Sequence, residues 1–409
     1  MTRKVLMALT ITIVGIAAYF AIGLFTPEAS PPLLGNAVGS SEQSVEIVPE
    51  PIMLEAPIVI EQTPNSNGSN GSNGSNGSNA YDTVTVSFAT NRQFDPAAPF
   101  DDQFGTERGD LIYGEASVSI PPNHERGVLE QQNWFASFIF EPNPEKHVLV
   151  QELAVLDRAA VLNLIAEQAG EDDGAVLAYI HGYNTSFGKA ARRMGQMSHD
   201  LKWGGASFFF SWPSDGGFER YSHDRNAAQQ SIPAMKTVLK DLGSIPQAQR
   251  IILIAHSMGT YVLTAALKEL ALEQHPVTKR ISTIILAAPD IDKATFVDQI
   301  APQFSQMPQA SFTIYTSSKD TALKASRAVW GDGRLGDSTD GPLLLNGFET
   351  VDATGAESDF FGHTYFGDNP TIIEDISDIV VKNLPAKDRP LLRAEVTDAG
   401  TFWRINLTK

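Results

Sequence analysis

The chain has 409 residues, more than one typical domain requires, and 42% of them are hydrophobic, which is enough for a sizeable core. Acidic residues outnumber basic ones by 48 to 30, and the formal net charge of −18 at pH 7 repels nucleic-acid phosphates. The sequence has no cysteine, which excludes disulfides, thiolate nucleophiles and cysteine-ligated zinc. We therefore expect no nucleic-acid partner.

The first element of the chain is an apolar run. Arg3 and Lys4 precede residues 5–25, which carry no charge and reach the length of about 20 residues that spans a bilayer. The apolar core of a cleaved signal peptide is shorter, about 7–15 residues, and ends at a small-residue cleavage site that is not evident here. We expect residues 1–27 to be a transmembrane signal anchor, with a cleaved signal peptide as the alternative. The leading positive charges predict that the rest of the chain lies on the non-cytoplasmic side.

Residues 28–80 have the composition of a flexible linker. Prolines and acidic residues are frequent up to residue 64 without a sustained period, and Ser-Asn-Gly triplets follow up to residue 79. Glycine, serine and asparagine bury too little apolar surface to offset the conformational entropy that folding removes. We expect a flexible coil that tethers the folded part of the chain.

The folded part begins at residue 81, and we expect residues 81–409 to form one domain. Its opening portion, residues 81–155, is rich in predicted strands. Residues 83–88 alternate between polar and apolar side chains, and residues 114–120 and 134–140 have similar strand character. We therefore predict a β-rich extension ahead of the main part of the domain.

From about residue 156 the pattern changes to helices that alternate with short apolar strands. Strands without polar alternation are buried on both faces, as in a parallel sheet covered by helices. The predicted strands are residues 175–180, 206–210, 251–254, 281–286 and 311–315. The predicted helices are residues 187–202, 221–242, 258–274 and 293–304. This alternation predicts an α/β fold with a mostly parallel central sheet flanked by helices.

The sharpest local motif follows the third of these strands. It reads Ala-His-Ser-Met-Gly at residues 255–259 and leads directly into a predicted helix. A sharp turn between strand and helix holds a serine hydroxyl clear of the sheet, and it requires small residues on either side, here Ala255 and Gly259. The first helical N–H, that of Met258, then faces the negative charge that develops beside the serine. We predict Ser257 as a nucleophile and the Met258 N–H as an oxyanion donor.

Six segments, in this order, give the chain a wider resemblance. They are His-Gly-Tyr-Asn-Thr-Ser-Phe from residue 181, Phe-Ser-Trp-Pro-Ser from 210, the motif at 255–259, Ala-Ala-Pro-Asp-Ile-Asp from 287, Tyr-Thr-Ser-Ser-Lys-Asp-Thr-Ala-Leu from 315 and Gly-His-Thr-Tyr from 362. Together with Ala-Thr-Asn-Arg from residue 89, they resemble a bacterial α/β-hydrolase family of uncharacterised esterase/lipase-like proteins, over roughly residues 81–384. The resemblance implies an α/β-hydrolase fold and a serine hydrolase that cleaves a small-molecule ester without a cofactor. With the anchor, it also implies a location in the bacterial periplasm or at the cell surface.

A serine hydrolase of this fold places its acid after the nucleophile and its histidine last. Only His275 and His363 follow Ser257. His275 ends a predicted helix, where a cation interacts favourably with the helix dipole. His363 lies in a loop between glycine and tyrosine, after the apolar run that begins at Leu343. We predict His363 as the general base, which takes the Ser257 proton and returns it to the leaving group.

Two aspartates are candidates for the acid. Asp320 follows the predicted strand 311–315, and Asp290 follows the predicted strand 281–286. Both strand ends face the site, because ligands bind at the carboxyl ends of such sheets. The resemblance and the usual position of the acid after the penultimate strand favour Asp320. Asp290 stays open as the alternative acid. If it is not the acid, helix capping explains an aspartate at this position.

The second oxyanion donor is expected in the loop after the first strand of the parallel sheet. By resemblance it is the N–H of Tyr183, with Asn184 as the next candidate and as a pocket residue. Trp212, after the next strand, is a further pocket candidate, although a simple turn explains it equally well. We expect His181 and His256 to be structural.

The acidic, glycine-rich residues 331–341 do not match the aspartate spacing of an EF-hand, so we predict a solvated loop near the site. No histidine spacing in the sequence fits a metal site, and we expect no bound metal. Two alternative functions stay open: a tethered envelope binding protein without activity, and an amidase or peptidase with the same triad. The intact serine, acid and histidine favour an enzyme, and the choice of an ester depends on the resemblance.

Overall fold

The computed structural model of the chain describes residues 58–61, 81–131, 141–171, 173–215, 220–331, 333–356 and 365–406. All of these residues belong to one compact unit, Met53–Lys409. The predicted signal anchor, most of the predicted linker, the strand predicted at residues 134–140 and His363 lie outside the described residues. None of the helices in the described part is long and apolar enough to cross a membrane.

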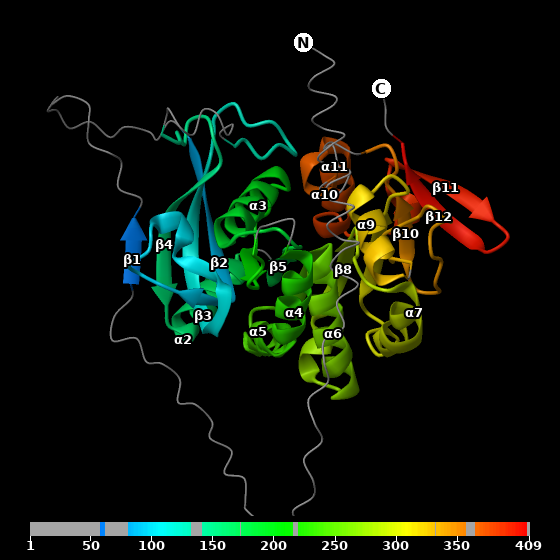
Figure 1. The fold of residues 1–409 in the computed structure, drawn as a ribbon, viewed down its shortest axis with the longest axis horizontal. Helices are drawn as coiled ribbons and strands as arrows, with labels where there is room; N and C mark the ends of the chain where they lie inside the picture. The colour runs from blue at the N-terminus through cyan, green and yellow to red at the C-terminus, as the bar shows by residue number, and fades with distance from the viewer. Residues whose placement is uncertain are drawn as a thin grey trace, which may run out of the picture. The chain divides into compact units, whose positions relative to one another are not determined.

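One sheet of 12 strands runs through the described residues (Figure 1). Its order is β1-β4-β3-β2-β6-β5-β7-β8-β9-β10-β12-β11. Neighbouring strands are parallel from β2 to β12 in this order, and antiparallel at both ends of the sheet. The strands are β1 Ile58–Glu61, β2 Asp82–Phe94, β3 Phe104–Ile120, β4 Leu149–Leu156, β5 Ala175–Ile180, β6 Ala206–Ser211, β7 Arg250–His256, β8 Ile281–Ala287, β9 Ser311–Thr316, β10 Glu349–Asp352, β11 Leu392–Thr397 and β12 Gly400–Ile405.

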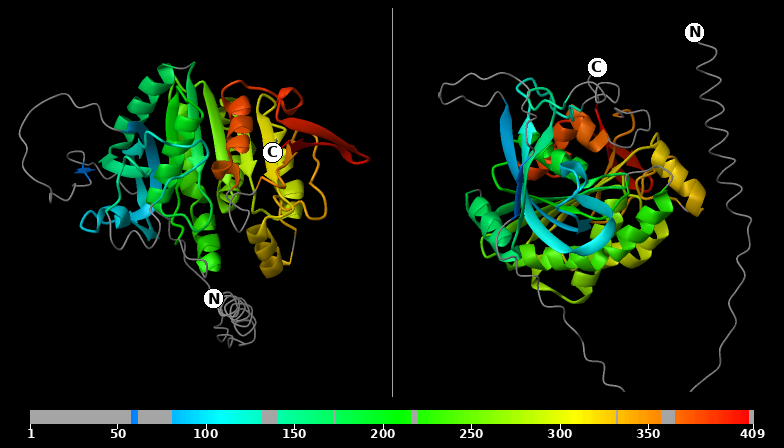
Figure 2. Two further views of the ribbon diagram at one scale, coloured as in Figure 1. Left: turned by 90° about the horizontal axis from the view of Figure 1, so that it is seen from above. Right: turned by 60° about the vertical axis from the view of Figure 1, so that its left-hand side comes forward.

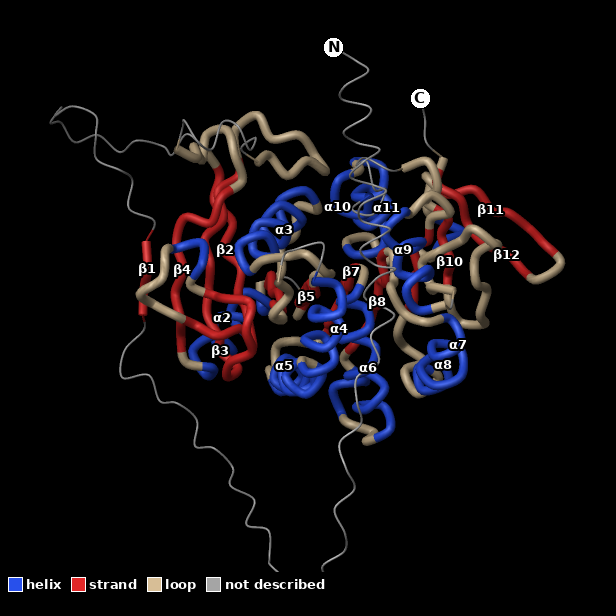
Figure 3. The backbone as a smooth tube through the Cα atoms, viewed as in Figure 1, coloured by secondary structure: helices blue, strands red, loops and turns tan. Residues whose placement is uncertain are grey.

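Helices cover both faces of this sheet (Figures 2 and 3). Buried residues of α2, α4, α5, α6 and α8 belong to the hydrophobic cluster on one face, and those of α3, α10 and α11 to the cluster on the other. The helices are α2 Arg158–Gly170, α3 Phe187–Asp200, α4 Tyr221–Gln230, α5 Ile232–Ser244, α6 Met258–Leu272, α7 Lys293–Thr295, α8 Ala301–Phe304, α9 Thr321–Trp330, α10 Tyr365–Asp368 and α11 Pro370–Val380.

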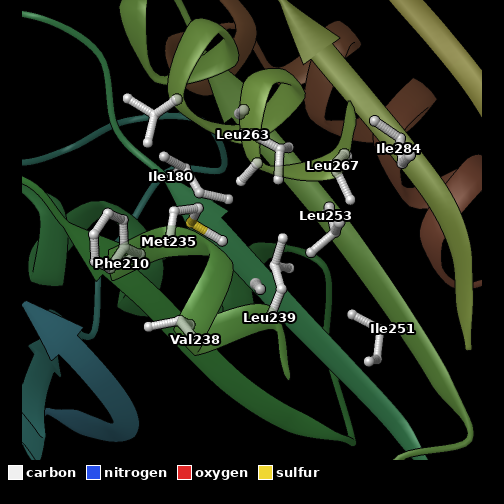
Figure 4. Packing of buried hydrophobic residues seen from close by; sticks show 14 of the residues in the cluster. Ile180, Phe210, Met235, Val238, Leu239, Ile251, Leu253, Leu263, Leu267 and Ile284 are labelled. Carbon is white, nitrogen blue, oxygen red and sulfur yellow. The ribbon is translucent and has the colours of Figure 1, made fainter. Parts of the chain in front are cut away.

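Strand β5 illustrates why the central strands are apolar throughout. Successive side chains of a strand point to opposite faces of a sheet. Val176, Ala178 and Ile180 belong to one hydrophobic cluster, and Leu177 and Tyr179 belong to the other. Because both faces are covered, every residue of β5 is buried. Figure 4 shows the helix side chains that pack on the first face: Met235, Val238 and Leu239 from α5 and Leu263 and Leu267 from α6.

Two helices that the sequence predicts as continuous are interrupted. The helix predicted at residues 221–242 is divided at Ser231 into α4 and α5. Pro233 lies in the first turn of α5, where the missing N–H has no partner to lose. Proline cannot continue a preceding helix, so α4 ends before it. The helix predicted at residues 293–304 is divided into α7, a π-helical turn and α8, which has a proline in its own first turn.

Two predicted irregular segments are more ordered than expected. In the predicted linker, Ile58–Glu61 pairs with β4 as the edge strand β1, so a flexible coil is wrong for these residues. A solvated loop is wrong for the centre of residues 331–341, where Arg334 and Leu335 are buried. The backbone N–H of Leu335 donates to the carbonyl of Ile291, 2.8 Å away. Composition alone did not reveal these apolar and backbone contacts.

Candidate active site

Ser257 occupies a strained turn between β7 and α6. Its backbone angles are φ 50° and ψ −124°, a region that residues other than glycine rarely adopt. The Ser257 N–H donates to the carbonyl of Ala287 at 2.9 Å, and the Ser257 carbonyl accepts from the N–H of Asp290 at 3.2 Å. Both backbone groups of the serine are therefore tied to the carboxyl end of β8. These contacts stabilise the strained conformation that the sequence motif predicts.

Two glycines allow the loop after β5 to lie directly against this turn. A Cβ atom on Gly259 would lie 2.2 Å from the carbonyl oxygen of His181. A Cβ atom on Gly182 would lie 2.8 Å from the Cβ atom of Ser257. Neither position accepts a side chain without movement of the backbone. The loop that carries the predicted donor Tyr183 therefore begins next to Ser257.

The two predicted oxyanion donors come from different elements. Met258 is the first residue of α6, and the first four N–H groups of a helix have no partner inside the helix. Tyr183 follows Gly182 in the loop after β5, and its ring packs edge-on against Tyr221 with ring centroids 5.4 Å apart. The N–H of Asn184 donates to the Asp224 carboxylate at 3.2 Å. Asn184 therefore contributes to the position of the loop through Asp224.

The side chain of Arg92 holds several loops around this site. Its guanidinium is almost fully buried at the end of β2. It donates to Ser211 Oγ at 2.8 Å, to the Gly105 carbonyl at 2.9 Å, to the Ser214 carbonyl at 3.0 Å and to the Thr185 carbonyl at 2.7 Å. One planar group thereby fixes both the loop after β5 and the loop after β6.

Asp224, at the start of α4, completes this arrangement. The carboxylate is fully buried and accepts from Ser214 Oγ, from the Asp215 N–H at 2.8 Å and from the Asn184 N–H at 3.2 Å. Burial lowers the pKa of Arg92 to about 9, and the charge of Asp224 opposes this shift, so the guanidinium keeps its proton at neutral pH. Sequence reasoning gave neither residue a role, and the only signal for Arg92 was its place in the Ala-Thr-Asn-Arg stretch.

His181 and Trp212 form a stacked pair under the loop after β5. The rings lie 5.0 Å apart at 16°, and Trp212 Nε1 donates to the His181 carbonyl at 2.8 Å. His181 Nδ1 lies 2.7 Å from the Gly182 carbonyl, and Nε2 lies 3.2 Å from Ser211 Oγ. Burial, with help from the charge of Arg92, lowers the pKa of His181 to about 3, so the ring is neutral at pH 7. Trp212 is fully buried and supports the loop instead of presenting a face to solvent.

The two candidate acids have different surroundings. Asp320 is fully buried four residues after β9, and its Oδ1 accepts from the Leu323 N–H at 2.9 Å, which caps α9. The Asp290 carboxylate accepts from the hydroxyls of Tyr221 and Ser326.

Asp290 also forms a buried ion pair. The Nε atom of Arg334 lies 3.4 Å from Asp290 Oδ1, and both side chains are almost fully buried. The Asp290 carboxylate is therefore surrounded by partners that do not include a histidine among the described residues.

The family match agrees with this architecture. The profile of the family described as "Alpha/beta hydrolase of unknown function (DUF900)" matches residues 157–382, more than half of the chain. An uncharacterized protein of Nostoc sp. strain PCC 7120 is 38% identical over 61 residues, which is 15% of this chain and only 16% of that protein.

Solved structures give weaker likenesses. A predicted CIB-like hydrolase from Thermoplasma acidophilum is 14% identical, with a TM-score of 0.32, over 58% of this chain and 93% of that chain. An esterase from Rhizomucor miehei is 13% identical, with a TM-score of 0.35, over 74% of this chain and 84% of that chain. By the match to more than half of its length, the chain belongs to the family of α/β-hydrolases of unknown function.

Proposed function

We propose that the protein is a serine hydrolase that cleaves carboxylic esters through an acyl-enzyme, with Ser257, Asp320 and His363 as its triad. The single observation that carries this proposal is the backbone of Ser257, which has a positive φ between β7 and α6. A strained serine at this turn is the geometry that presents a nucleophilic hydroxyl above a parallel sheet. A protein that only binds a ligand has no need of this strain.

The proposed cycle begins with acylation of Ser257. Ser257 Oγ attacks the ester carbonyl carbon while His363 accepts the Oγ proton. The N–H groups of Met258 and Tyr183 stabilise the oxyanion, because helix N-termini and preorganised amides favour developing negative charge. The bond from carbon to the alcohol oxygen then breaks, and His363 returns the proton to that oxygen. The N–H of Asn184 donates to Asp224, which counts against Asn184 as the second donor.

Deacylation repeats these steps with water. His363 takes a proton from water, the hydroxide oxygen bonds to the acyl carbon, and the Ser257 ester bond breaks. The proton returns from His363 to Ser257 Oγ, which regenerates the enzyme and releases a carboxylic acid. The same cycle on an amide would release an amine, so paired ester and amide substrates with one acyl chain decide between an esterase and an amidase.

Asp320 is the better candidate for the acid. It follows β9, two places from the nucleophile strand β7 in the sheet. Asp290 already balances the charge of Arg334 and accepts from two hydroxyls. A carboxylate committed in this way is less available to orient a histidine.

We also propose that residues 5–25 tether the enzyme to a bacterial membrane, with residues 28–80 as a mostly flexible linker and residues 81–409 on the non-cytoplasmic side. The proposal depends on the charges and apolar length of the N-terminal segment. Resistance of the full chain to extraction with alkaline carbonate, lost on deletion of residues 5–25, tests it. Release of the full chain by carbonate would refute the tether.

The decisive test of the activity uses a fluorophosphonate probe on the full chain. We expect one label at Ser257, located by mass spectrometry, together with turnover of short p-nitrophenyl esters. Ser257→Ala should abolish both, whereas Ser305→Ala, at an exposed position, should change neither. A folded protein that takes no label and turns over no ester would favour the envelope binding protein instead.

A further inference from the structure

A cluster of imidazole and carboxylate groups lies at the end of α3 that is remote from Ser257. His199 and Asp200 belong to the last turn of α3, and His124 comes from the connection between β3 and β4. One ligand atom from each of these residues lies within 4.8 Å of the others. Helix α3 begins just after the loop that contacts Ser257, and its 14 residues extend about 21 Å.

The separations in this cluster fit one small cation. His124 Nε2 lies 2.8 Å from Asp200 Oδ1, and His199 Nδ1 lies 3.8 Å from the same oxygen. Nitrogen and oxygen ligands bind zinc at about 2.0–2.2 Å, so neighbouring ligands of a tetrahedral ion are about 3.4 Å apart. The two measured separations lie on either side of this value. Small side-chain adjustments are therefore enough to place an ion between the three atoms.

The remaining polar atoms of His124 and Asp200 are already held by outer partners. His124 Nδ1 lies 2.8 and 3.0 Å from the two Glu130 oxygens, and Asp200 Oδ2 accepts from the Gly127 N–H at 2.8 Å and from Gln196 Nε2. A carboxylate on one ring nitrogen orients the other nitrogen toward a metal, as in many histidine-ligated sites. When a metal displaces the proton of Nε2, Glu130 can still hold the proton on Nδ1, which leaves the Nε2 lone pair for the metal.

His199 gives an independent observation. Its Nδ1 atom is buried and has no hydrogen-bond partner among the described residues, which is costly for a polar atom. Its Nε2 atom lies 3.6 Å from the Asp82 carboxylate. The ring is 35% exposed and lines a surface hollow with Lys202 and Trp203, so an ion can reach it from solvent.

We propose that His124 Nε2, His199 Nδ1 and Asp200 Oδ1 bind a divalent transition-metal ion, with zinc as the best match. Two imidazoles and one carboxylate suit zinc better than magnesium or calcium, which prefer oxygen ligands. Water supplies the fourth ligand of a tetrahedral ion. The three carboxylates of Asp82, Glu130 and Asp200 balance its charge.

The ion would be structural. His124 and Glu130 belong to the connection between β3 and β4, and Gly127 of the same connection donates to Asp200. An ion bound to His124 and to both residues of α3 therefore fastens this connection to the helix. Its binding free energy adds to the free energy of unfolding. This proposal does not depend on the hydrolase activity, because no residue of the proposed triad contributes to it.

Calorimetric titration of the chelator-treated full chain tests the site. We expect one equivalent of Zn²⁺ to bind with a Kd at or below about 1 μM, and Mg²⁺ to give no comparable heat. His199→Ala should weaken zinc binding by about tenfold or more. His199 is the residue of choice because its partial exposure makes the substitution compatible with folding.

His223→Ala is a closely matched control. His223 also precedes an aspartate on a helix, is 33% exposed and has a buried Nδ1 without a hydrogen-bond partner among the described residues, but no second histidine joins it in a metal-ligating group there. Its substitution should leave zinc affinity unchanged. Zinc should also raise the unfolding temperature of the wild type and the His223 variant, but not of the His199 variant. Absence of stoichiometric zinc binding to the wild type, or equal loss in both variants, overturns the proposal.

Discussion

The two ends of helix α3 are held by different polar chemistry. At its start, Arg92 donates to the Thr185 carbonyl and fixes the loop that approaches Ser257. At its end, His124 and Asp200 face one another, with Glu130 behind. A guanidinium keeps its charge across the physiological pH range, whereas imidazole and carboxylate groups respond to protons and metal ions. Arg92 therefore keeps its charge near the candidate active site, whereas the groups at the other end of α3 can change their protonation.

The histidines near the two ends have pKa shifts of opposite sign. Burial lowers the pKa of His181 to about 3, so this ring contributes stability above its unfolded pKa and loses it as the pH falls. Burial also disfavours the charged form of His124, but hydrogen bonds to Asp200 and Glu130 outweigh this and raise its pKa. In the metal-free protein, the contribution of His124 is therefore present at low pH and lost as the pH rises through its folded pKa.

The largest expected effect concerns Asp320, the proposed acid of the triad. Asp320→Asn should lower kcat on a p-nitrophenyl ester by about 10⁴-fold, because the histidine loses the partner that orients it. Asparagine also caps helices well, so α9 should persist and the free energy of unfolding should change little.

Asp290→Asn is the counterpart of this variant. It should keep turnover within about tenfold of the wild type and lower the free energy of unfolding, because Arg334 loses a charged partner. Steady-state kinetics and urea unfolding measure both quantities. The reverse pattern would identify Asp290 as the acid.

A smaller effect on kcat is expected for substitution of Arg92, which holds the loop before α3. Arg92→Met should lower kcat by about 100-fold, because the loop of Tyr183 shifts by a fraction of an ångström or more. It should also lower the free energy of unfolding by about 3–5 kcal/mol. The buried carbonyls lose their hydrogen-bond donor, and the buried Asp224 carboxylate loses a nearby positive charge. Arg126→Met is the control at a surface ion pair with Glu374 and should lower it by less than about 1 kcal/mol. Equal losses in the two variants would contradict a special role for Arg92.

The smallest expected effect is the pH dependence of stability. Between pH 7.5 and 5, the neutral His181 should cost the wild type about 2 kcal/mol of its free energy of unfolding, given a folded pKa of about 3. His181→Asn should remove most of this dependence, as measured by urea unfolding at both pH values. His223→Asn, at a side chain that is 33% exposed, should keep the wild-type dependence. Parallel pH profiles for all three proteins would show that His181 is not held neutral.

The strands of the parallel sheet and the turn at Ser257 were predictable because their signals are local. Residues 175–180, predicted as a strand, form β5 at the same bounds. The turn at Ser257 was predicted from the residues directly next to it in the sequence. Strand β11 has no such signal, since its residues are half-buried or exposed and do not form an apolar run. The interruption at Ser231 was missed although Pro233 lies inside the predicted helix 221–242, where a proline breaks the helical hydrogen-bond pattern.

The supporting residues were not predictable because folding brings them together from distant positions. His124 and Asp200 are 76 residues apart in the chain, so no spacing rule connects them. Arg92 and Asp224 likewise gain their roles only when β2 lies beside β6 and the loops after β5 and β6 meet. Motifs report chemistry that is contiguous in sequence, and the contacts that position it are mostly non-local.

Arg92 connects segments that are far apart in the chain, so its contacts form only after a long stretch of the chain has been synthesised. Its guanidinium joins the Ser214 carbonyl, 122 residues further along the chain, to the Thr185 carbonyl, 93 residues further along. A chain that is synthesised only as far as residue 184 lacks both of these carbonyls, so Arg92 cannot yet hold the loops after β5 and β6. Under the proposed function, hydrolysis would therefore require the loops after β5 and β6 to be assembled around Arg92.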